Sequence, residues 1–199
     1  MKVERALVSV YDKSGLESLA SALEAWGVTV YSSGGTARRL RELGYGRLVE
    51  VSSYTGFPES PGGLVKTLHP RVHGGILLNP EDPTHRDWME ANQVQHIDLV
   101  VVNLYPFEEA VQGGASLEEA AHQIDIGGPT LIRSAAKASI LYNKVCVVTD
   151  PSQYGELVEE LQQQGGGIST GFARRMALEA FRRTASYDQA IKGFLEARL

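Results

Sequence analysis

The chain has a single cysteine, Cys146, among its 199 residues. One thiol cannot build a disulfide framework within the chain, and it cannot supply a cysteine-based metal knuckle. A lone cysteine flanked by apolar residues is typical of a protein from a reducing compartment. We therefore expect a cytoplasmic protein held together by a hydrophobic core, and a hydrophobic content of 43% is enough to form one.

Long apolar runs and excess positive charge are also missing. No stretch approaches the ~18 consecutive apolar residues of a transmembrane helix, and the N-terminal segment MKVERALVSV has too short an apolar part for a signal peptide. The formal net charge is −5 and the sequence pI is about 5.6, whereas nucleic-acid-binding domains are usually basic. We expect a soluble protein that has neither a membrane nor a nucleic acid as partner. A local basic pocket for a small anion is compatible with this balance.

Three common ligand-binding motifs are absent. The sequence has no GxxxxGK[ST] phosphate loop, no GxGxxG dinucleotide fingerprint and no HExxH zinc motif. His69 and His73 have the i,i+4 spacing of metal ligands on a helix, but Pro70 between them argues against a helical zinc site. We expect these histidines to be structural or to contact substrate, and we expect no metal.

Short β-rich runs recur along the chain, and helical patterns lie between several of them. This alternation predicts a doubly wound α/β fold with a mainly parallel sheet. We divide the chain into an α/β core, residues 1–150, and a helical extension, residues 151–199, whose tail is one long or two shorter helices. The expected strands are residues 6–11, 28–33, 47–52, 97–105 and 144–149, and the expected helices are residues 14–26, 36–43, 129–137 and 151–164.

Residues 53–96 depart from this rhythm. The segments FPESPGG, HPRVHGG and NPEDP are rich in proline and glycine. The stretch is too long for an ordinary connection between two elements of a compact domain. We interpret it as a loop-rich insertion or a functional loop.

The segment SSGGT, residues 32–36, joins an expected strand to an expected helix. Gly34 and Gly35 allow backbone N–H groups to converge, while Ser33 and Thr36 add hydroxyl donors at the positive end of a helix. These features are typical of a phosphate site, and Lys13 at a neighbouring strand end favours it further. The alternative is a capped turn in which Thr36 only starts the helix.

Two further segments supply polar residues near the strand ends. Lys66 and Thr67 lie between glycines and a proline in GGLVKTLHPRVHGG, where a lysine could equally be solvated surface. Asn103 ends the most apolar strand, and its buried amide needs partners that a ligand can supply. Tyr105 lies two residues further on and could also contact a ligand. The alternative is that Tyr105 is only an aromatic side chain at the edge of the core.

The segment IDIGGPTLIRSAAK, residues 124–137, combines an acid, two glycines and a helix start. Pro129 suits the first turn of a helix, where a missing N–H is tolerated. Gly127 and Gly128 before a helix start are typical of a phosphate seat, but the carboxylate of Asp125 beside them would repel a phosphate. Lys137 lies on the polar face of this helix. The alternative to a functional role is that Lys137 and Arg133 are simply two cations on a solvated helix face.

Seven motifs in this order carry a resemblance to a known family: SVYDKSG, SSGGTA, YTGFPE, VKTLHPRVHGGIL, DLVVVNLYPFEE, IDIGGPTLIRSAAK and AFRRTASYDQAI. They resemble the IMP cyclohydrolase domain of the bifunctional AICAR transformylase/IMP cyclohydrolase family, over essentially the whole chain. The resemblance implies a methylglyoxal-synthase-like fold, a three-layer α/β/α sandwich on a parallel sheet. It also implies a homodimer that uses neither a metal nor an organic cofactor.

The implied reaction closes the purine ring of the formylated carboxamide ribonucleotide FAICAR, with loss of water, to give IMP. The resemblance implies chemical roles for four residues: Lys66, Tyr105, Asp125 and Lys137. From the chemistry of ring closure we expect Asp125 to be the base, Lys137 a proton donor or acceptor, and Lys66 and Tyr105 oxyanion or positioning groups. The division of roles between Lys66 and Lys137 is left open. The residues expected to bind substrate are Asp12, Lys13, Ser33, Gly34, Gly35, Thr36, Thr67, Asn103 and Gly127.

The sequence departs from the family pattern at three positions. Leu64 replaces a frequent arginine and so removes a donor, Tyr11 replaces a frequent serine, and Ala138 replaces a usual asparagine. The transformylase domain of the bifunctional enzymes is not in this chain, so we expect no formyl transfer from folate. Two other functions of the same fold remain as alternatives: an allosteric ligand-binding module like that of carbamoyl phosphate synthetase, and methylglyoxal synthase.

Overall fold

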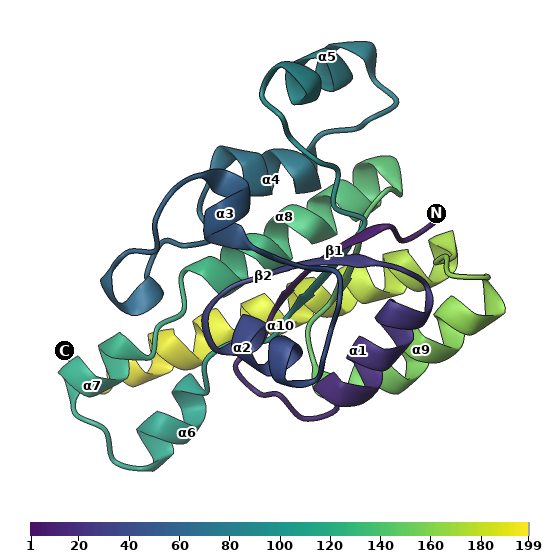
Figure 1. Ribbon diagram of the computed structural model, residues 1–199. Coiled ribbons are helices and arrows are strands. Elements are labelled where there is room, and N and C mark those ends of the chain that lie inside the picture. The colour runs from purple at the N-terminus through teal and green to yellow at the C-terminus, as the bar shows by residue number, and fades with distance from the viewer. Residues whose placement is uncertain (199) are drawn as a thin grey trace.

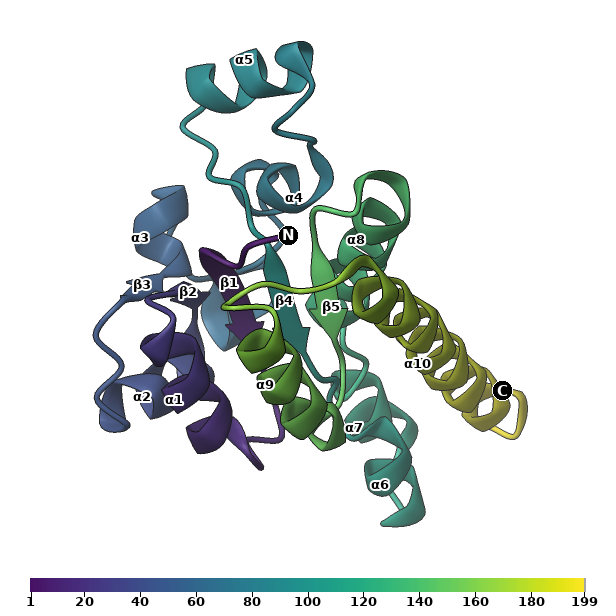
Figure 2. The ribbon, with the colours of Figure 1, turned by 90° about the vertical axis from the view of Figure 1, so that its right-hand side faces the viewer.

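The computed structural model describes residues 1–198 and contains a five-stranded parallel sheet in the order β3-β2-β1-β4-β5. Helices flank both faces of the sheet (Figures 1 and 2). The predicted α/β class and parallel sheet are therefore confirmed. The strands are β1 (Arg5–Ser9), β2 (Thr29–Ser32), β3 (Leu48–Glu50), β4 (Leu99–Val102) and β5 (Cys146–Val148).

Alternate residues of the central strands belong to two separate hydrophobic cores. In β4, Leu99 and Val101 face one core, whereas Val100 and Val102 face the other. Successive side chains of a strand point to opposite faces, so a strand that is apolar throughout must be covered on both sides. This is why the strand runs lack the alternation of polar and apolar residues found in half-exposed sheets.

The core on the first face packs against α1 (Leu16–Ala25), α2 (Gly34–Glu42) and α9 (Tyr154–Gln163). The second face is covered by α4 (Pro70–Leu77) and α8 (Gly127–Tyr142). The tail forms one long helix, α10 (Thr170–Glu196), which packs against α8 and along β5 (Figure 2). Because β5 is an edge strand, α10 covers an edge that could otherwise pair with another chain.

Two local predictions are wrong. The third strand ends at Glu50, and its expected last residues form the short helix α3 (Val51–Thr55). Residues 53–96 are more helical than predicted, since Pro70 opens α4 and Pro83 opens α5 (Pro83–Ala91). Proline is favourable in the first turn of a helix, so both prolines mark helix starts rather than loops. A short 3-10 helix, η1 (Pro61–Gly63), lies in the same stretch.

Two short helices, α6 (Phe107–Gln112) and α7 (Leu117–His122), follow β4 and lie outside the predicted elements. The expected helix over residues 151–164 begins as a 3-10 helix, η2 (Pro151–Gln153), and continues as α9. Among the described residues, no helix combines the length and the apolar character needed to cross a membrane.

The connections diverge on the two sides of β1. The chain passes from β1 to β2 and β3 on one side and then returns to β4 on the other. In open α/β sheets, ligands bind beyond the carboxyl ends of the strands at such a switch point. The fold therefore directs attention to the loops that follow β1 and β4, together with the start of α2 after β2.

Candidate functional site

A cavity of about 530 Å³ lies beyond the carboxyl ends of the strands. It brings together segments from five parts of the chain: the loops after β1 and β4, the start of α2, the η1 loop, and the turn that begins α8. Most of the residues that the sequence placed in a site line this cavity. They are Lys13, Ser33, Gly35, Thr36, Lys66, Thr67, Asn103, Tyr105, Asp125 and Gly127.

The start of α2 forms one end of the cavity. Ser33 is the residue that precedes the helix, and its hydroxyl oxygen is buried without a hydrogen-bond partner among residues 1–198. The first backbone N–H groups of a helix also lack partners within it and carry partial positive charge. A buried polar group without a partner is rare and needs an explanation. An anion seated against the start of α2 would satisfy both sets of donors.

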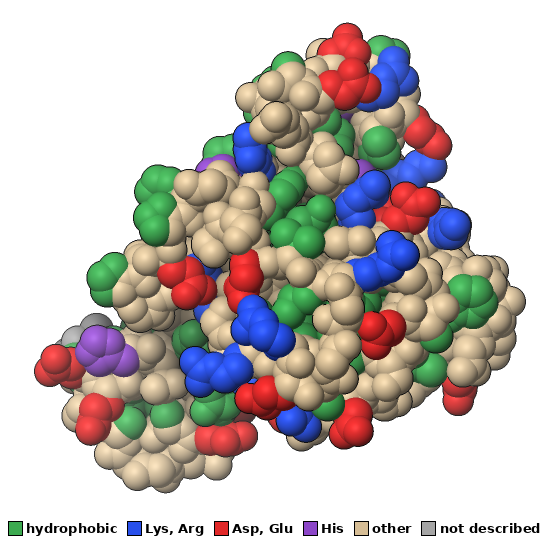
Figure 3. Space-filling model, in the orientation of Figure 1, with side chains coloured by type: hydrophobic (Ala, Val, Ile, Leu, Met, Phe, Trp, Pro, Cys, Tyr) green, Lys and Arg blue, Asp and Glu red, His purple; other side chains and the backbone are tan. Residues whose placement is uncertain are grey.

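Two lysines stand beside these donors. A Cβ built on Gly34, whose φ is +55°, would lie 2.8 Å from Lys66 Nζ, and one built on Gly35 would lie 3.8 Å from Lys13 Nζ. Glycine is thus needed at position 34 for both the left-handed backbone and the close approach of the ammonium group. Basic and acidic side chains are interspersed over the surface around α2 (Figure 3). The arginines of the last turn of α2 pair with glutamates, so the positive charge at the start of the helix comes from the two lysines. This end of the cavity is built for negative charge.

The Thr36 hydroxyl is not available in the way that the sequence suggested. It donates to the carbonyl oxygen of Val10 at 2.9 Å and accepts from the N–H of Val10 at 3.1 Å. Its only hydrogen is therefore engaged in joining α2 to the end of β1. In this cavity Thr36 contributes its backbone N–H, at the third position of the helix, rather than a hydroxyl donor.

Asp125 lies in the turn before α8. One of its carboxylate oxygens accepts from the N–H of Gly128 at 2.8 Å. Burial raises the pKa of Asp125 above its ordinary value, although backbone N–H groups and the charge of Lys66 oppose that shift. A carboxylate with a raised pKa is a stronger base than one in water, and perturbed groups of this kind are common in active sites.

The glycines before α8 make room for this carboxylate. A Cβ on Gly128 would collide with the Asp125 carboxylate and would lie 2.6 Å from Leu104 Cδ2. A Cβ on Gly127 would lie 2.9 Å from Thr67 Oγ1. The double glycine therefore lets the start of α8 pack closely against the loop carrying Lys66 and Thr67. This spacing closes the cavity around Asp125.

Tyr105 and Tyr11 form a pair at the mouth of the cavity, with ring centroids 5.5 Å apart and an angle of 69° between the rings. Burial raises the pKa of Tyr105, and the neighbouring Asp125 and Tyr11 raise it further. Tyr105 therefore stays protonated at neutral pH and can act as a hydrogen-bond donor. It is partly exposed, with 39% of its surface accessible, so its hydroxyl can meet a ligand.

Asn103 lines the cavity, but its amide is already satisfied without a ligand. Its Oδ1 accepts from the N–H groups of Tyr11 and Asp12 at 2.7 and 3.0 Å, and its Nδ2 donates to the Asp12 carbonyl at 2.8 Å. Asn103 therefore fixes the loop after β1 that carries Lys13. The expectation that its amide needs a ligand as partner is not met.

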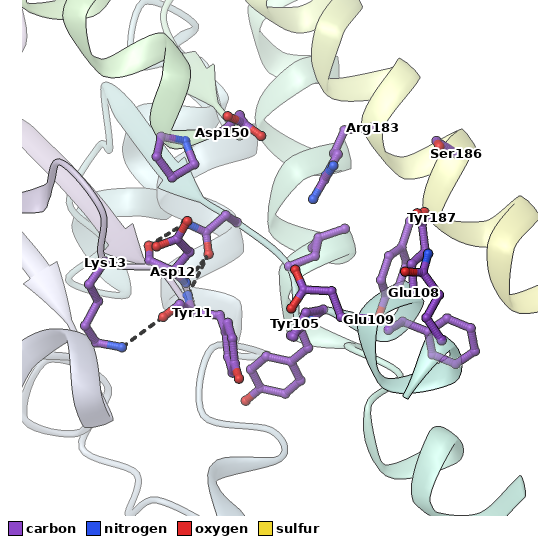
Figure 4. A pocket seen from close by; sticks show the side chains of 16 residues that line it. Tyr11, Asp12, Lys13, Tyr105, Glu108, Glu109, Asp150, Arg183, Ser186 and Tyr187 are labelled. Carbon is purple, nitrogen blue, oxygen red and sulfur yellow. Dashed lines mark hydrogen bonds between the residues drawn. The ribbon is translucent and has the colours of Figure 1, made fainter. Parts of the chain in front are cut away.

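A second cavity of about 860 Å³ adjoins the first and shares Tyr11, Lys13, Asn103 and Tyr105 with it (Figure 4). Asp12 lines only this second cavity, and its side chain accepts from the N–H of Ser14 at 2.8 Å. Asp12 is therefore separated from most of the other predicted binding residues. The far wall comes from α10 and includes Arg183, Ser186 and Tyr187.

Lys137 is not among the residues that line either cavity. It lies exposed on α8, nine residues beyond Gly128. At 1.5 Å per residue this is roughly 14 Å along the helix axis, farther than one lysine side chain spans. Within a single chain, the structure does not bring Lys137 to Asp125.

Several lining residues were not proposed from the sequence. They include His122 at the end of α7, Ile124 and Ile126 beside Asp125, and Gly62 and Gly63 in the η1 loop. The isoleucines and glycines lie in segments that the sequence singled out, but their residue types carry no chemistry that would mark them as site residues. His122 lies outside those segments and reaches the cavity only through folding. Among the described residues, no group of three or more His, Cys, Asp or Glu side chains is arranged to hold a metal ion.

Comparisons with known proteins agree with this architecture. The MGS-like domain family matches residues 15–130, and the AICARFT/IMPCHase bienzyme family matches residues 135–198. The structure titled "Crystal structure of ForH" superposes with a TM-score of 0.80 at 31% identity, covering 96% of this chain and 97% of that one.

Two curated relatives are bifunctional purine biosynthesis proteins PurH. The protein from Synechococcus sp. is 51% identical over 195 residues, and that from Magnetococcus marinus is 48% identical over 197 residues. These alignments cover 97% and 98% of this chain but only 36% of each relative. The chain thus belongs to the MGS-like domain family, and it spans only about a third of the length of the PurH proteins that it resembles.

Proposed function

We propose that this chain is an IMP cyclohydrolase, which closes the purine ring of FAICAR to give IMP and water. The observation that carries the proposal is a buried carboxylate, Asp125, with a raised pKa, in the same cavity as an anion seat at the start of α2. A nucleotide monophosphate has a phosphate for the seat and a reacting heterocycle for the carboxylate. The similarity of nearly the whole chain to part of the purine biosynthesis proteins PurH supports the same substrate class.

The phosphate would lie against the start of α2. There it would accept from the Ser33 hydroxyl and from the free N–H groups of the first turn, with Lys13 and Lys66 balancing its charge. Holding the phosphate fixes the remainder of the nucleotide relative to Asp125. This arrangement lowers the entropic barrier to a reaction between two groups of the same substrate.

Ring closure joins the carboxamide nitrogen to the formyl carbon. In the proposed mechanism, Asp125 removes a proton from the nitrogen as the new N–C bond forms. The formyl oxygen first gains negative charge, then takes up protons and leaves as water while the C=N bond forms. The C=N bond forms to the formamide nitrogen, which loses its own proton as the aromatic ring is completed, so that FAICAR yields IMP and one water.

The formyl oxygen requires donors while it carries negative charge. Lys66 and the protonated Tyr105 line the same cavity as Asp125 and are assigned this role. Lys66 lies between the anion seat and Asp125, since it approaches Gly34 and its charge acts on the Asp125 carboxylate. Its ammonium group therefore serves the phosphate and the reacting centre in one bound substrate.

A chemical role for Lys137 is proposed only within the homodimer expected from the sequence. Lys137 is exposed on α8, and Ile140 and Leu141 on the same helix are 54% and 56% exposed. Exposed apolar residues around a cation are compatible with a face that a second copy covers. In that arrangement, Lys137 of one copy would enter the cavity of the other.

The deciding experiment supplies FAICAR to the purified chain and follows IMP formation by absorbance. We expect turnover without added metal or folate. A folded chain that binds IMP but does not turn over FAICAR would instead be an allosteric module of this fold. Release of methylglyoxal from dihydroxyacetone phosphate, with no IMP formed, would identify the third candidate function. The unfolded chain, checked by circular dichroism, is the background control.

A further inference from the structure

Tyr187 on α10 holds the turn that carries Asp125. Its hydroxyl accepts from the N–H of Asp125 at 2.9 Å and donates to the carbonyl oxygen of Gln123 at 2.9 Å. Tyr187 is only 5% exposed. One buried hydroxyl therefore satisfies two backbone groups of a segment that is more than sixty residues away in sequence.

The ring of the same tyrosine contacts the other side of the cavity wall. It packs edge-to-face on Phe107, with ring centroids 6.2 Å apart, and Phe107 packs in turn on Phe194 at 5.8 Å. The N–H of Phe107 donates to the carbonyl oxygen of Tyr105 at 2.9 Å. Tyr187 thus touches both the segment that carries Asp125 and the segment that carries Tyr105.

This double contact ties the turn before α8 to α10. Between the end of α7 and the start of α8 the backbone is irregular, and buried backbone groups need partners wherever no helix or strand supplies them. The partner here is a side chain of the C-terminal helix. Figure 4 shows Tyr187 on α10 across the second cavity from Tyr105.

We propose that Tyr187 is a positioning residue for ring closure: its hydroxyl fixes the Asp125 turn so that the carboxylate stays beside Lys66 and Tyr105. The inference rests on the proposed cyclohydrolase function. It assigns α10 a task beyond covering the edge of β5, because the helix also orients the proposed base. Small displacements of a reacting group lower the rate without weakening the contacts that bind the phosphate.

The test compares Tyr187→Phe with Tyr45→Phe. Each substitution removes one buried tyrosine hydroxyl and keeps the ring. The Tyr45 hydroxyl donates to the carbonyl oxygen of Val28 at 2.7 Å and lines neither cavity. For Tyr187→Phe we expect kcat for FAICAR to fall about ten- to a hundredfold, with little change in KM. Tyr45→Phe should retain the kcat of the unmodified chain.

Hydrogen exchange adds a readout that does not depend on turnover. Peptides covering residues 121–128 should exchange faster in Tyr187→Phe than in the unmodified chain, and Tyr45→Phe should leave them unchanged. If Tyr187→Phe shifts the urea unfolding midpoint as Tyr45→Phe does but leaves both kcat and this exchange unaltered, the hydroxyl is merely structural and the inference is overturned.

The two proposals fail in different ways. Absence of turnover in the unmodified chain would contradict the cyclohydrolase function, whereas the exchange comparison would still decide whether Tyr187 holds the Asp125 turn. Turnover in the unmodified chain and in Tyr45→Phe, together with unaltered kcat in Tyr187→Phe, would contradict only the positioning role. IMP titration of all three proteins confirms that each has a folded site.

Discussion

The Thr36 hydroxyl exchanges two hydrogen bonds with the backbone of Val10, donating at 2.9 Å and accepting at 3.1 Å. The neighbouring Ser33 hydroxyl has no partner among the described residues. Two hydroxyls that look alike in the sequence are therefore used differently. Thr36 joins the start of α2 to β1, and Ser33 is left to meet a ligand.

Replacing Thr36 should mainly lower stability. Thr36→Val removes the side-chain partner of two buried backbone groups, and an unsatisfied buried group costs about 1–3 kcal/mol. Urea unfolding should show a loss of this size, measured at fixed pH. Thr36→Ser retains the hydroxyl and is the matched control. A Thr36→Val protein as stable as the unmodified chain would contradict the structural role.

Replacing Ser33 should mainly weaken substrate binding. Ser33→Ala removes a buried hydroxyl that bonds to nothing in the part of the chain that the structure describes, so stability should change by no more than about 0.5 kcal/mol. Loss of this donor to the proposed phosphate should raise KM for FAICAR. It should also weaken the binding free energy of IMP by about 1 kcal/mol or more. Isothermal titration with IMP checks this, and unchanged affinity would argue against a phosphate at this end of the cavity.

Asp125→Asn should abolish turnover while making the protein more stable near neutral pH. Loss of a general base lowers rates by about 10²- to 10⁴-fold, but asparagine can still accept from the Gly128 N–H. Burial raises the pKa of Asp125 in the folded chain. The stability that the protonated Asp125 carboxyl contributes is therefore fully present only at a pH below its pKa in the unfolded chain, about 3.9. That stability is lost as the pH rises through the higher pKa of the folded chain.

The stability difference between Asp125→Asn and the unmodified chain should accordingly grow with pH across that window. Urea unfolding at a series of pH values measures it directly. In kinetics, the acidic limb of kcat/KM should lie above the ordinary carboxyl range for the same reason. A limb at the ordinary value, together with no pH-dependent gain in the variant, would show that Asp125 is not the buried base described here.

Gly128→Ala should disable the site by displacing the carboxylate. The new Cβ would collide with the Asp125 side chain and would lie 2.6 Å from Leu104 Cδ2. Gly155→Ala in α9 is the matched control, because its Cβ would meet nothing within 4 Å. We expect kcat to fall about a hundredfold in Gly128→Ala and to be retained in Gly155→Ala. Equal activities would mean that the double glycine does not shape the reacting end.

The proposed role of Lys137 predicts complementation between two inactive variants. If one copy supplies Lys137 to the cavity of the other, refolding Lys137→Ala together with Asp125→Asn should restore about a quarter of the activity, since half of the dimers are mixed and each has one intact site. Lys66→Ala mixed with Asp125→Asn is the control. Both of those residues line one chain's cavity, so no activity should return.

Recovery in the first mixture only would place Lys137 in trans. No recovery in either mixture, with both chains dimeric by light scattering, would exclude a shared site. An active Lys137→Ala protein would remove the residue from the chemistry altogether.

The sequence was sufficient for the fold class and for much of the cavity lining. Strand-forming runs between helical patterns are local signals, and they predicted all five strands to within a few residues. The carboxyl ends of parallel strands lie at the same edge of a sheet, so the sequence alone places SSGGT, Lys13 and Asn103 near one another. The errors lie where proline and glycine were taken to indicate loops, although Pro70 and Pro83 open helices.

Hydrogen-bond partners were beyond the reach of sequence. Whether a hydroxyl or an amide faces a ligand or the protein depends on which backbone groups lie nearby after folding, and those groups are distant along the chain. Ser33 and Thr36 differ in this respect, whereas Asn103 and Tyr187 both bond to backbone groups of the protein. The sequence by itself determined which segments meet beyond the sheet. Only the tertiary structure decided that Asn103 holds a loop and that Tyr187 holds Asp125, because each depends on contacts between residues far apart in the chain, which no local pattern specifies.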